Sequence, residues 1–420
     1  KRGIVSKPTL NYSLRGTMSN QPDPIPLLSG DQYSNLIPEA VNNMGRLPIN
    51  IGAFPEFLYD PLIPDQFYNY RNNTDWVDAI TQTGYTQDHN LSMQGGGEKA
   101  RYYASIGYLN STGTTIGTDL SRITTKINLD FNVSNRIRFR SDFTYTHVNN
   151  TLNYTGSIRN VAYNKMPNMA IREYDEFGNQ SPNYLSPVSN IQGQYPGTFN
   201  PVAMAQEASS RLFGERITPK FQLQYDILPD NLLISTFDLQ FDINNSKTKR
   251  FLPQVATGRP STETSVNRAD DNDGDAFAVN TKLNFIFTPK LGEKHTLQSL
   301  LSIQTEDNQS NSQSITVSNT ASSYLQDTSN PARVNASGLR LDAGFGQQRT
   351  LGVVLSNQYS LLDRYIINVG ARLDGNSRFG ANNRYGIFPS VSTRWRISGE
   401  NFMRGVEWID DLSIRASYGA

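Results

Sequence analysis

The sequence predicts an all-β fold, specifically an antiparallel transmembrane β-barrel, and three observations support this. Runs of about ten residues alternate apolar and polar side chains, which is the period of a β-strand. The runs come in pairs joined by tight turns, and long polar connections separate the pairs. One side of each clear run carries no charge, while the other carries charges of both signs. Membrane barrels combine short turns, long loops and this alternation.

The amino-acid composition excludes several classes of protein and several kinds of site. The 420 residues include 38 Lys+Arg and 38 Asp+Glu, so the chain lacks the basic excess of a nucleic-acid-binding protein. No run approaches the roughly 18 apolar residues that a transmembrane helix requires. There is no cysteine, which excludes disulfides, thiolate zinc sites and a cysteine nucleophile.

The clearest pair of runs spans 121–133 and 137–147. In the first run Ile127 and Phe131 occupy odd positions, whereas Lys126 occupies an even one. The second run repeats this arrangement after a turn at 133–136. We therefore expect a hairpin with one apolar and one charged face.

The same pattern predicts thirteen strands. They are expected near 10–18, 91–93, 102–108, 121–133, 137–147, 217–227, 233–243, 279–287, 297–303, 351–361, 365–373, 385–397 and 412–418. The long connections are expected at 19–86, 109–120, 149–216, 244–277, 306–348 and 375–384, with short helices near 30–44 and 75–81. The connection 398–411 is longer than the other tight turns. Loops this long usually carry function.

The uncharged face decides between a membrane barrel and a soluble all-β assembly. In the strands 123–133, 137–147, 217–227 and 233–243, none of the 24 odd positions is charged, whereas ten of the 21 even positions in 122–132, 138–146, 218–226 and 234–242 are. A soluble sandwich also alternates in this way. Aromatic residues, however, gather near the ends of the apolar faces, where membrane barrels place interfacial girdles. They are Tyr145, Tyr225, Phe241, Tyr359, Tyr365, Tyr385 and Trp395. We therefore expect the apolar face to contact lipid and the charged face to line a wet lumen.

An odd strand count adds a further expectation. Single-chain bacterial barrels close with an even number of strands. The sequence is therefore expected to be part of a longer barrel.

Particular residues also resemble those of one family. The segments 73–78, 83–92, 95–99 and 102–108 resemble the start of the barrel in SusC/RagA-type TonB-dependent outer-membrane transporters. Later signatures similar to those of the family are Asn200–Ala203, Arg372–Gly380, Arg384–Ser392, Trp395–Ser398 and Leu412–Gly419. Several motifs in the family's order make the resemblance specific.

The resemblance implies domain boundaries, partners and a function. Residues 1–7 would be the tail of the plug domain, and 8–420 the N-terminal part of a barrel of about 22 strands. The plug, the TonB box and roughly nine strands would lie outside this sequence. The implied partners are a SusD-like surface lipoprotein, the TonB complex and outer-membrane lipid. The implied function is import of nutrient oligomers, glycans first and oligopeptides second, across the outer membrane of a Gram-negative bacterium.

Two groups of residues are candidates for substrate contact. Charges expected to face the lumen are Arg122, Lys126, Asp130, Arg138, Arg140 and Asp142, joined by Lys220, Asp226, Asp238 and Asp242. They would line a substrate path, or pair across neighbouring strands and hold the plug, and pairing is the favoured interpretation. Loop aromatics are expected to stack on sugar rings or grip peptides, or else to pack loops together. These are Tyr68, Tyr70, Trp76, Tyr174, Phe177 and Tyr195.

Catalytic and metal sites are weakly indicated. The histidines are His89, His147 and His295, and no motif places a serine and an acid beside any of them. We expect no enzyme; the alternatives are a barrel hydrolase using His147 as base, and a structural or adhesin barrel. The acidic stretch 269–275 suggests a surface loop that binds calcium, but it lacks the EF-hand ligand pattern. We expect no cofactor.

Overall fold

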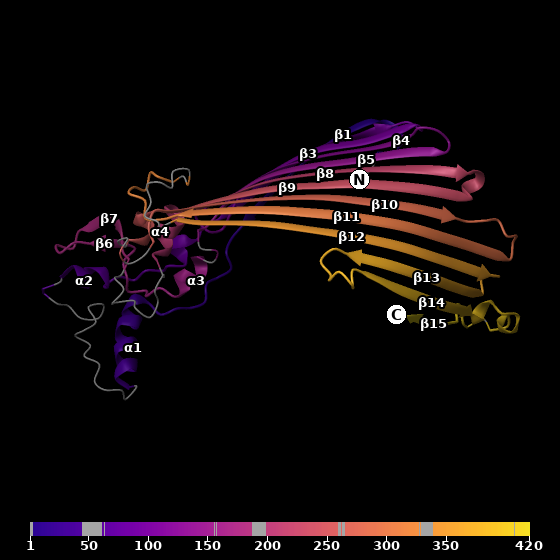
Figure 1. The fold of residues 1–420 in the computed structure, drawn as a ribbon. Helices are drawn as coiled ribbons and strands as arrows, with labels where there is room; N and C mark the ends of the chain where they lie inside the picture. The colour runs from indigo at the N-terminus through magenta and orange to yellow at the C-terminus, as the bar shows by residue number, and fades with distance from the viewer. Residues whose placement is uncertain are drawn as a thin grey trace.

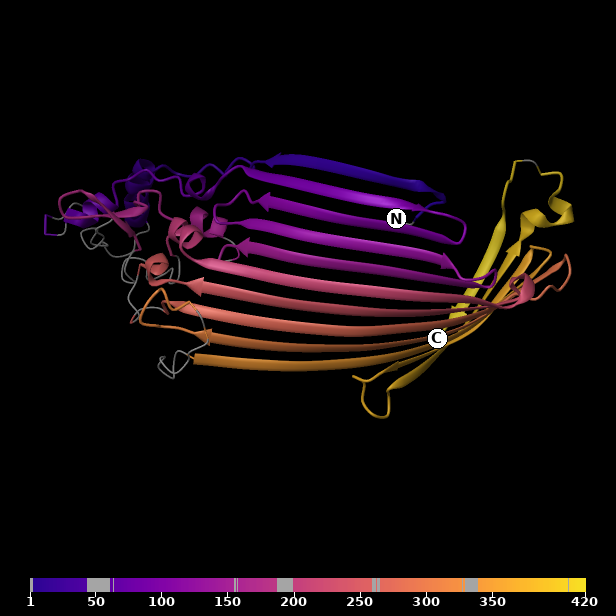
Figure 2. The same cartoon turned by 90° about the horizontal axis from the view of Figure 1, so that it is seen from above.

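The chain forms one long curved sheet with a cluster of short elements at one end (Figures 1 and 2). The structure is a computed structural model that describes residues 3–43, 61–62, 64–154, 156, 158–186, 199–258, 262, 265–326, 328, 339–406 and 408–420. The expectation of thirteen barrel strands is confirmed, because the main sheet has 13 strands. No helix among the described residues is long and apolar enough to span a membrane.

All neighbouring strands of the large sheet are antiparallel and follow chain order. The strands are β1 Ser6–Ser19, β2 Gly84–Gly96, β3 Ala100–Thr112, β4 Asp119–Asn132, β5 Ile137–Leu152, β8 Ser209–Leu228, β9 Leu233–Leu252, β10 Arg268–Phe287, β11 His295–Val317, β12 Leu339–Leu361, β13 Tyr365–Asn376, β14 Tyr385–Arg396 and β15 Ser413–Gly419. Since β1 begins at Ser6, the sheet starts inside the segment 1–7 that was expected to be plug tail.

Short turns join the strands at one end of the sheet, which we call the turn end. Between β8 and β9, the helical turn Pro229–Asn231 places Asp230 and Asn231 at φ of 58° and 60°. Asparagine and aspartate tolerate this left-handed region better than most residues, because their short polar side chains bond locally. The tight turn expected between the runs 217–227 and 233–243 is therefore confirmed.

The opposite end, which we call the loop end, carries the long connections (Figure 1). They contain helices and a second, two-stranded sheet. These elements are α1 Gly30–Asn43, α2 Pro64–Asn69, the 3-10 turn η2 Asp78–Ile80, α3 Ile158–Tyr163, β6 Arg172–Tyr174, β7 Gln180–Tyr184, α4 Pro201–Gln206 and α5 Gln254–Thr257. The helix expected near 75–81 is reduced to η2.

Strands β8 to β12 are longer than the sequence predicted. On β9 the apolar positions end at Ile243, and Asn245, Lys247 and Lys249 continue on the same side. Beyond the apolar band both sides of a strand meet water, so the alternation that marks a half-buried strand disappears. The connections expected at 244–277 and 306–348 are consequently much shorter than predicted.

The strand register keeps most apolar positions of neighbouring strands on one side of the sheet. Phe139 pairs with Leu223, Phe237 with Leu283, and Tyr365 with Trp395. We call this side the apolar face and the other the charged face. Apolar-face side chains such as Leu129, Leu223, Phe237 and Ile367 are exposed. Within the described residues, no second layer of protein covers this face (Figures 1 and 2).

Candidate functional site

The six predicted lumen charges lie on β4 and β5 and share the charged face. Asp130 is opposite Arg140, Lys126 is opposite Thr144, and Asp142 is opposite Asn128. Arg122 and Arg138 occupy even positions of the same two strands and therefore lie on the same side. The structure brings these residues together as one strip of the sheet.

These charges make cross-strand contacts. Arg140 Nε lies 3.6 Å from Asp130 Oδ2, and its Nη1 donates to Gln222 Oε1 over 3.0 Å. Gln222 in turn donates to Asp238 Oδ1, which lies 3.6 Å from Lys220 Nζ. Carboxylate, guanidinium, amide and ammonium groups thus form a ladder across β4, β5, β8 and β9. Pairing across strands fixes the sheet while leaving a polar surface.

A concavity lies within this ladder. It has a volume of about 370 Å³ and is lined by Lys126, Asn128, Asp142, Thr144, Thr218, Lys220 and Gln240. Polar groups of both signs in one hollow suit hydroxyl-rich or zwitterionic molecules better than apolar ones.

The loop end has its own hydrophobic core, built mainly from the segments 70–80, 158–185 and 202–208. Asn200 caps α4 by accepting from the backbone N–H groups of Val202 and Ala203. Its buried amide donates to the carbonyls of Ile171 and Leu185, so every side of Asn200 is satisfied. Pro201 suits the first helical position because its missing N–H would have no partner there.

The expected aromatic contacts divide into two groups. Tyr70 and Trp76 are buried in this loop core, and Trp76 Nε1 donates to the Met166 carbonyl over 2.9 Å. Their rings are therefore packing residues and offer no surface to a substrate. Tyr174 packs against the same core. Tyr195 lies outside the described residues.

Tyr68 and Phe177 remain accessible, with 37% and 76% of their surfaces exposed. Phe177 sits in the turn between β6 and β7, where Asp175 accepts from the backbone N–H groups of Phe177 and Asn179. These hydrogen bonds, led by that from Asn179, lower the pKa of Asp175. Gly178 follows at φ 79°, and an added Cβ there would stand 3.2 Å from the Tyr68 ring. The turn that carries Phe177 therefore lies against the Tyr68 ring.

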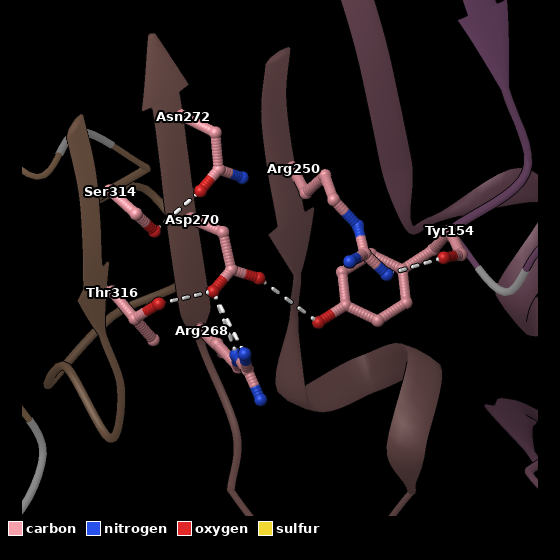
Figure 3. Close-up of polar contacts among 7 residues, drawn as sticks. All are labelled: Tyr154, Arg250, Arg268, Asp270, Asn272, Ser314 and Thr316. Carbon is pink, nitrogen blue, oxygen red and sulfur yellow. Dashed lines mark hydrogen bonds and ion pairs between the residues drawn. The ribbon is translucent and has the colours of Figure 1, made fainter. Parts of the chain in front are cut away.

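A buried polar cluster ties the loop end to the sheet (Figure 3). Asp270 on β10 accepts from Thr316 Oγ1 over 2.6 Å and from Arg268 Nη2 over 2.9 Å. Its second oxygen accepts from the Tyr154 hydroxyl over 3.4 Å. Arg250 on β9 donates to the Tyr154 carbonyl and covers its ring. Burial, followed by the nearby Asp270 charge, raises the pKa of Tyr154. Sequence reasoning missed this cluster because its members are far apart along the chain.

The acidic stretch 269–275 is part of the strand β10 and is not a surface loop. Asp271, Asp273 and Asp275 share one side of the strand, whereas Asp270 lies on the other. Asp271 and Asp273 instead lie 3.5 and 3.1 Å from Lys247 Nζ. Within the described ranges, no group of three or more His, Asp or Glu side chains is arranged to hold a metal.

His147 lies on the apolar face, near the loop end of β5. Its Nδ1 is 3.3 Å from Glu215 Oε1, and the Tyr145 hydroxyl donates to the same oxygen. This position is opposite the charged face, so a molecule passing along the charged face cannot reach the imidazole.

Comparison with known proteins decides the family. A family model described as "TonB dependent receptor-like, beta-barrel" matches residues 174–420, more than half of the chain. The chain belongs to this family. The thirteen strands, the two faces and the long loop end are therefore parts of a TonB-dependent receptor barrel.

Individual relatives agree with the expected SusC/RagA resemblance, which is confirmed. TonB-dependent receptor P39 of Formosa agariphila is 28% identical over 351 residues, covering 82% of this chain and 31% of that protein. TonB-dependent receptor SusC of Bacteroides thetaiotaomicron is 23% identical over 433 residues, covering 98% of this chain and 39% of that protein. The chain spans less than two fifths of the length of these relatives.

Solved structures show the same fold. The RagAB peptide transporter superposes with a TM-score of 0.73 at 19% identity, covering all of this chain and 48% of that one. Two of the segments that resemble the SusC/RagA family, Asn73–Asp78 and Asn200–Ala203, contribute residues to the same loop core of this chain.

Proposed function

We propose that this chain is a wall of an outer-membrane transporter that imports nutrient oligomers into a Gram-negative bacterium. The observation that carries the proposal is the exposed apolar face opposite a face of paired charges. The apolar face suits contact with lipid and the charged face suits contact with water. In a bilayer, a closed barrel gives the backbone N–H and C=O groups of every strand a hydrogen-bond partner. Family membership supports energy supply through TonB.

Capture would begin at the loop end. The exposed Tyr68 belongs to α2 and the exposed Phe177 to the turn between β6 and β7, and these elements lie at the loop end (Figure 1). Aromatic faces bind the C–H faces of sugar rings as well as apolar peptide side chains. We propose glycan oligomers as the first substrate class and oligopeptides as the second. The RagAB neighbour, named as a peptide transporter, supports the second class.

Passage would follow the charged face. The ladder through Arg140, Gln222 and Asp238 contains both hydrogen-bond donors and hydrogen-bond acceptors. The hydroxyl or amide groups of a passing substrate could therefore exchange one hydrogen-bond partner for the next along the charged face. We propose a SusD-like lipoprotein as the partner at the loop end, and the TonB complex as the partner on the periplasmic side. Both proposals rest on the likeness to SusC and RagAB.

We propose no enzymatic activity. A barrel hydrolase using His147 is the alternative, and the position of His147 on the apolar face opposes it. In the full-length protein, His147→Ala should leave the uptake of oligomers unchanged. The rate of oligomer hydrolysis should also be the same with and without the substitution.

Growth of a deletion strain tests the proposal. The strain should lose growth on one class of oligomer, glycan or peptide, supplied at low concentration as sole carbon source, and should keep growth on the corresponding monomer. Complementation with the full-length gene should restore growth. Unchanged growth on every oligomer would favour the structural or adhesin alternative, and hydrolysis without uptake would favour the enzyme.

A further inference from the structure

The connection between β14 and β15, residues 397–412, differs from the other connections at the turn end. Most of those are tight, such as the segment 362–364. This one contains two 3-10 turns, Ile397–Gly399 and Asn401–Met403. Its described residues include Phe402 and Trp408, with 67% and 84% of their surfaces exposed. Two large, strongly exposed aromatic side chains on one connection suggest a contact surface.

The start of this connection is fixed to the apolar face. Glu400 Oε1 accepts from the Tyr365 hydroxyl over 2.5 Å and from Trp395 Nε1 over 3.0 Å. Tyr365 and Trp395 pair across β13 and β14 on the apolar face, with their rings stacked at 6.5 Å. Arg364 Nη1 donates to the other Glu400 oxygen over 3.2 Å. These contacts hold the carboxylate at the rim of the apolar face.

The following residues stay near that rim. Successive backbone bonds run from Met403 to Glu400, from Arg404 to Asn401 and from Val406 to Met403, and they keep the segment compact. Phe402 follows two residues after Glu400, which binds the Tyr365–Trp395 pair, and its side chain is exposed. Further on, Asp411 contacts Arg394 and Arg396 on the charged side, so the connection crosses the end of the sheet.

We infer that residues 400–406 and 408 form a membrane-interface foot, which places Phe402 and Trp408 among the phospholipid headgroups at the turn end. The argument is continuity, because the foot begins on the aromatic rim of the surface that we assign to lipid. Aromatic residues concentrate at membrane–water interfaces because one part of the ring prefers hydrocarbon and the other water. Arg404 lies between Phe402 and Trp408 in the sequence and is also exposed, and a guanidinium suits lipid phosphate. This inference rests on the proposed outer-membrane location.

Fluorine NMR on the full-length transporter in nanodiscs tests the foot. The protein is labelled with 5-fluorotryptophan, and the resonances are assigned by their loss in Trp408→Phe, Trp395→Phe and Trp76→Phe. A Phe402→Trp variant adds a second probe in the foot. Spin-labelled phospholipid should broaden the Trp408, Trp395 and Phe402→Trp resonances more than a water-soluble paramagnetic chelate does. The Trp76 resonance should not respond to the lipid, because its ring is buried in the loop core.

The outcomes separate the two proposals. If Trp395 responds to the lipid while Trp408 and Phe402→Trp respond only to the chelate, the foot is refuted and the membrane location stands. If Trp395 does not respond to the lipid either, the outer-membrane assignment itself fails.

Discussion

The guanidinium of Arg250 lies over the ring of Tyr154, with Cζ 4.3 Å from the ring centroid, and Nη2 donates to the Tyr154 carbonyl over 2.6 Å. Tyr154 belongs to the long connection after β5, whereas Arg250 is part of β9. Together with Asp270, this pair joins a long connection at the loop end to the sheet (Figure 3). Loops are generally more mobile than the strands that they connect.

Removing Arg250 should loosen the loop core. Arg250→Ala removes a hydrogen bond and a cation–π contact, which together are expected to contribute about 2 kcal/mol to local stability. Hydrogen exchange of the amides in 158–171 should become faster, while exchange in β8 and β9 should stay slow. Tyr154→Phe is the matched control, because it keeps the ring and loses only the 3.4 Å contact to Asp270. Equal acceleration in both variants would argue against a role for Arg250.

The turn that presents Phe177 depends on the Asp175 carboxylate. Asp175→Ala should weaken oligomer binding by up to roughly tenfold, since one or two turn hydrogen bonds are lost. Asp175→Asn keeps an accepting oxygen and should bind nearly as well as the unmodified protein. Titration of the purified full-length protein with its oligomer checks both. Equal affinity in the alanine variant would show that the turn does not present the substrate-binding ring.

The same turn gives a pH dependence. Because the folded turn lowers the pKa of Asp175, its stabilisation is complete above the ordinary aspartate value of 3.8 and is lost as the pH falls through the lower folded value. Oligomer affinity should therefore be flat near neutral pH, and the part due to this turn should disappear only in strong acid. Asp175→Asn should remove this loss of oligomer affinity in strong acid. If the loss of affinity in acid persists in this variant, it is caused by the titration of another group.

The ladder on the charged face should stabilise the barrel. Arg140→Ala removes the ion-pair partner of the partly buried Asp130 and the donor to Gln222, and should lower unfolding stability by about 1–3 kcal/mol. A double-mutant cycle with Asp130→Asn isolates the pair. Lys290→Ala serves as the control, because its partner Asp230 lies in an exposed turn. A similar loss in both single variants would contradict the ladder's role.

The apolar face should reject charge. Leu239→Arg, near the middle of the apolar part of β9, should cost about 2–4 kcal/mol in lipid. Gln240→Arg, the next residue, faces the charged side and should cost little. Refolding titrations into lipid vesicles compare the two. Equal costs would mean that the faces do not differ in their surroundings.

Sequence alone predicted the strands wherever one face was apolar, as in 123–133 and 233–243. It failed beyond Ile243 on β9 and before Phe277 on β10, because there both faces are wet and the apolar alternation ends. For this reason the stretch 269–275 was expected to be a surface loop, whereas it is part of β10. The charged face was predictable residue by residue, because parity within a strand fixes the side of each residue.

The loop end was less predictable. Tyr70 and Trp76 looked like ligand contacts because aromatic residues in long connections have two uses, and only the fold distinguishes packing from binding. Asn200–Pro201 did carry a local signal, that of a helix start. No local pattern links Tyr154 to Arg250 and Asp270, since three separate segments must meet before that cluster exists.

The central claim is that the apolar face contacts lipid and the charged face contacts water. A nitroxide scan along residues 233–243 of β9, in the full-length protein in nanodiscs, tests it most directly, using single cysteine substitutions. Oxygen accessibility should peak at odd positions such as Phe237 and Leu239, and accessibility to a water-soluble nickel chelate should peak at even positions such as Gln240. Odd positions that are closed to both reagents would place the apolar face against another layer of protein and would contradict the account.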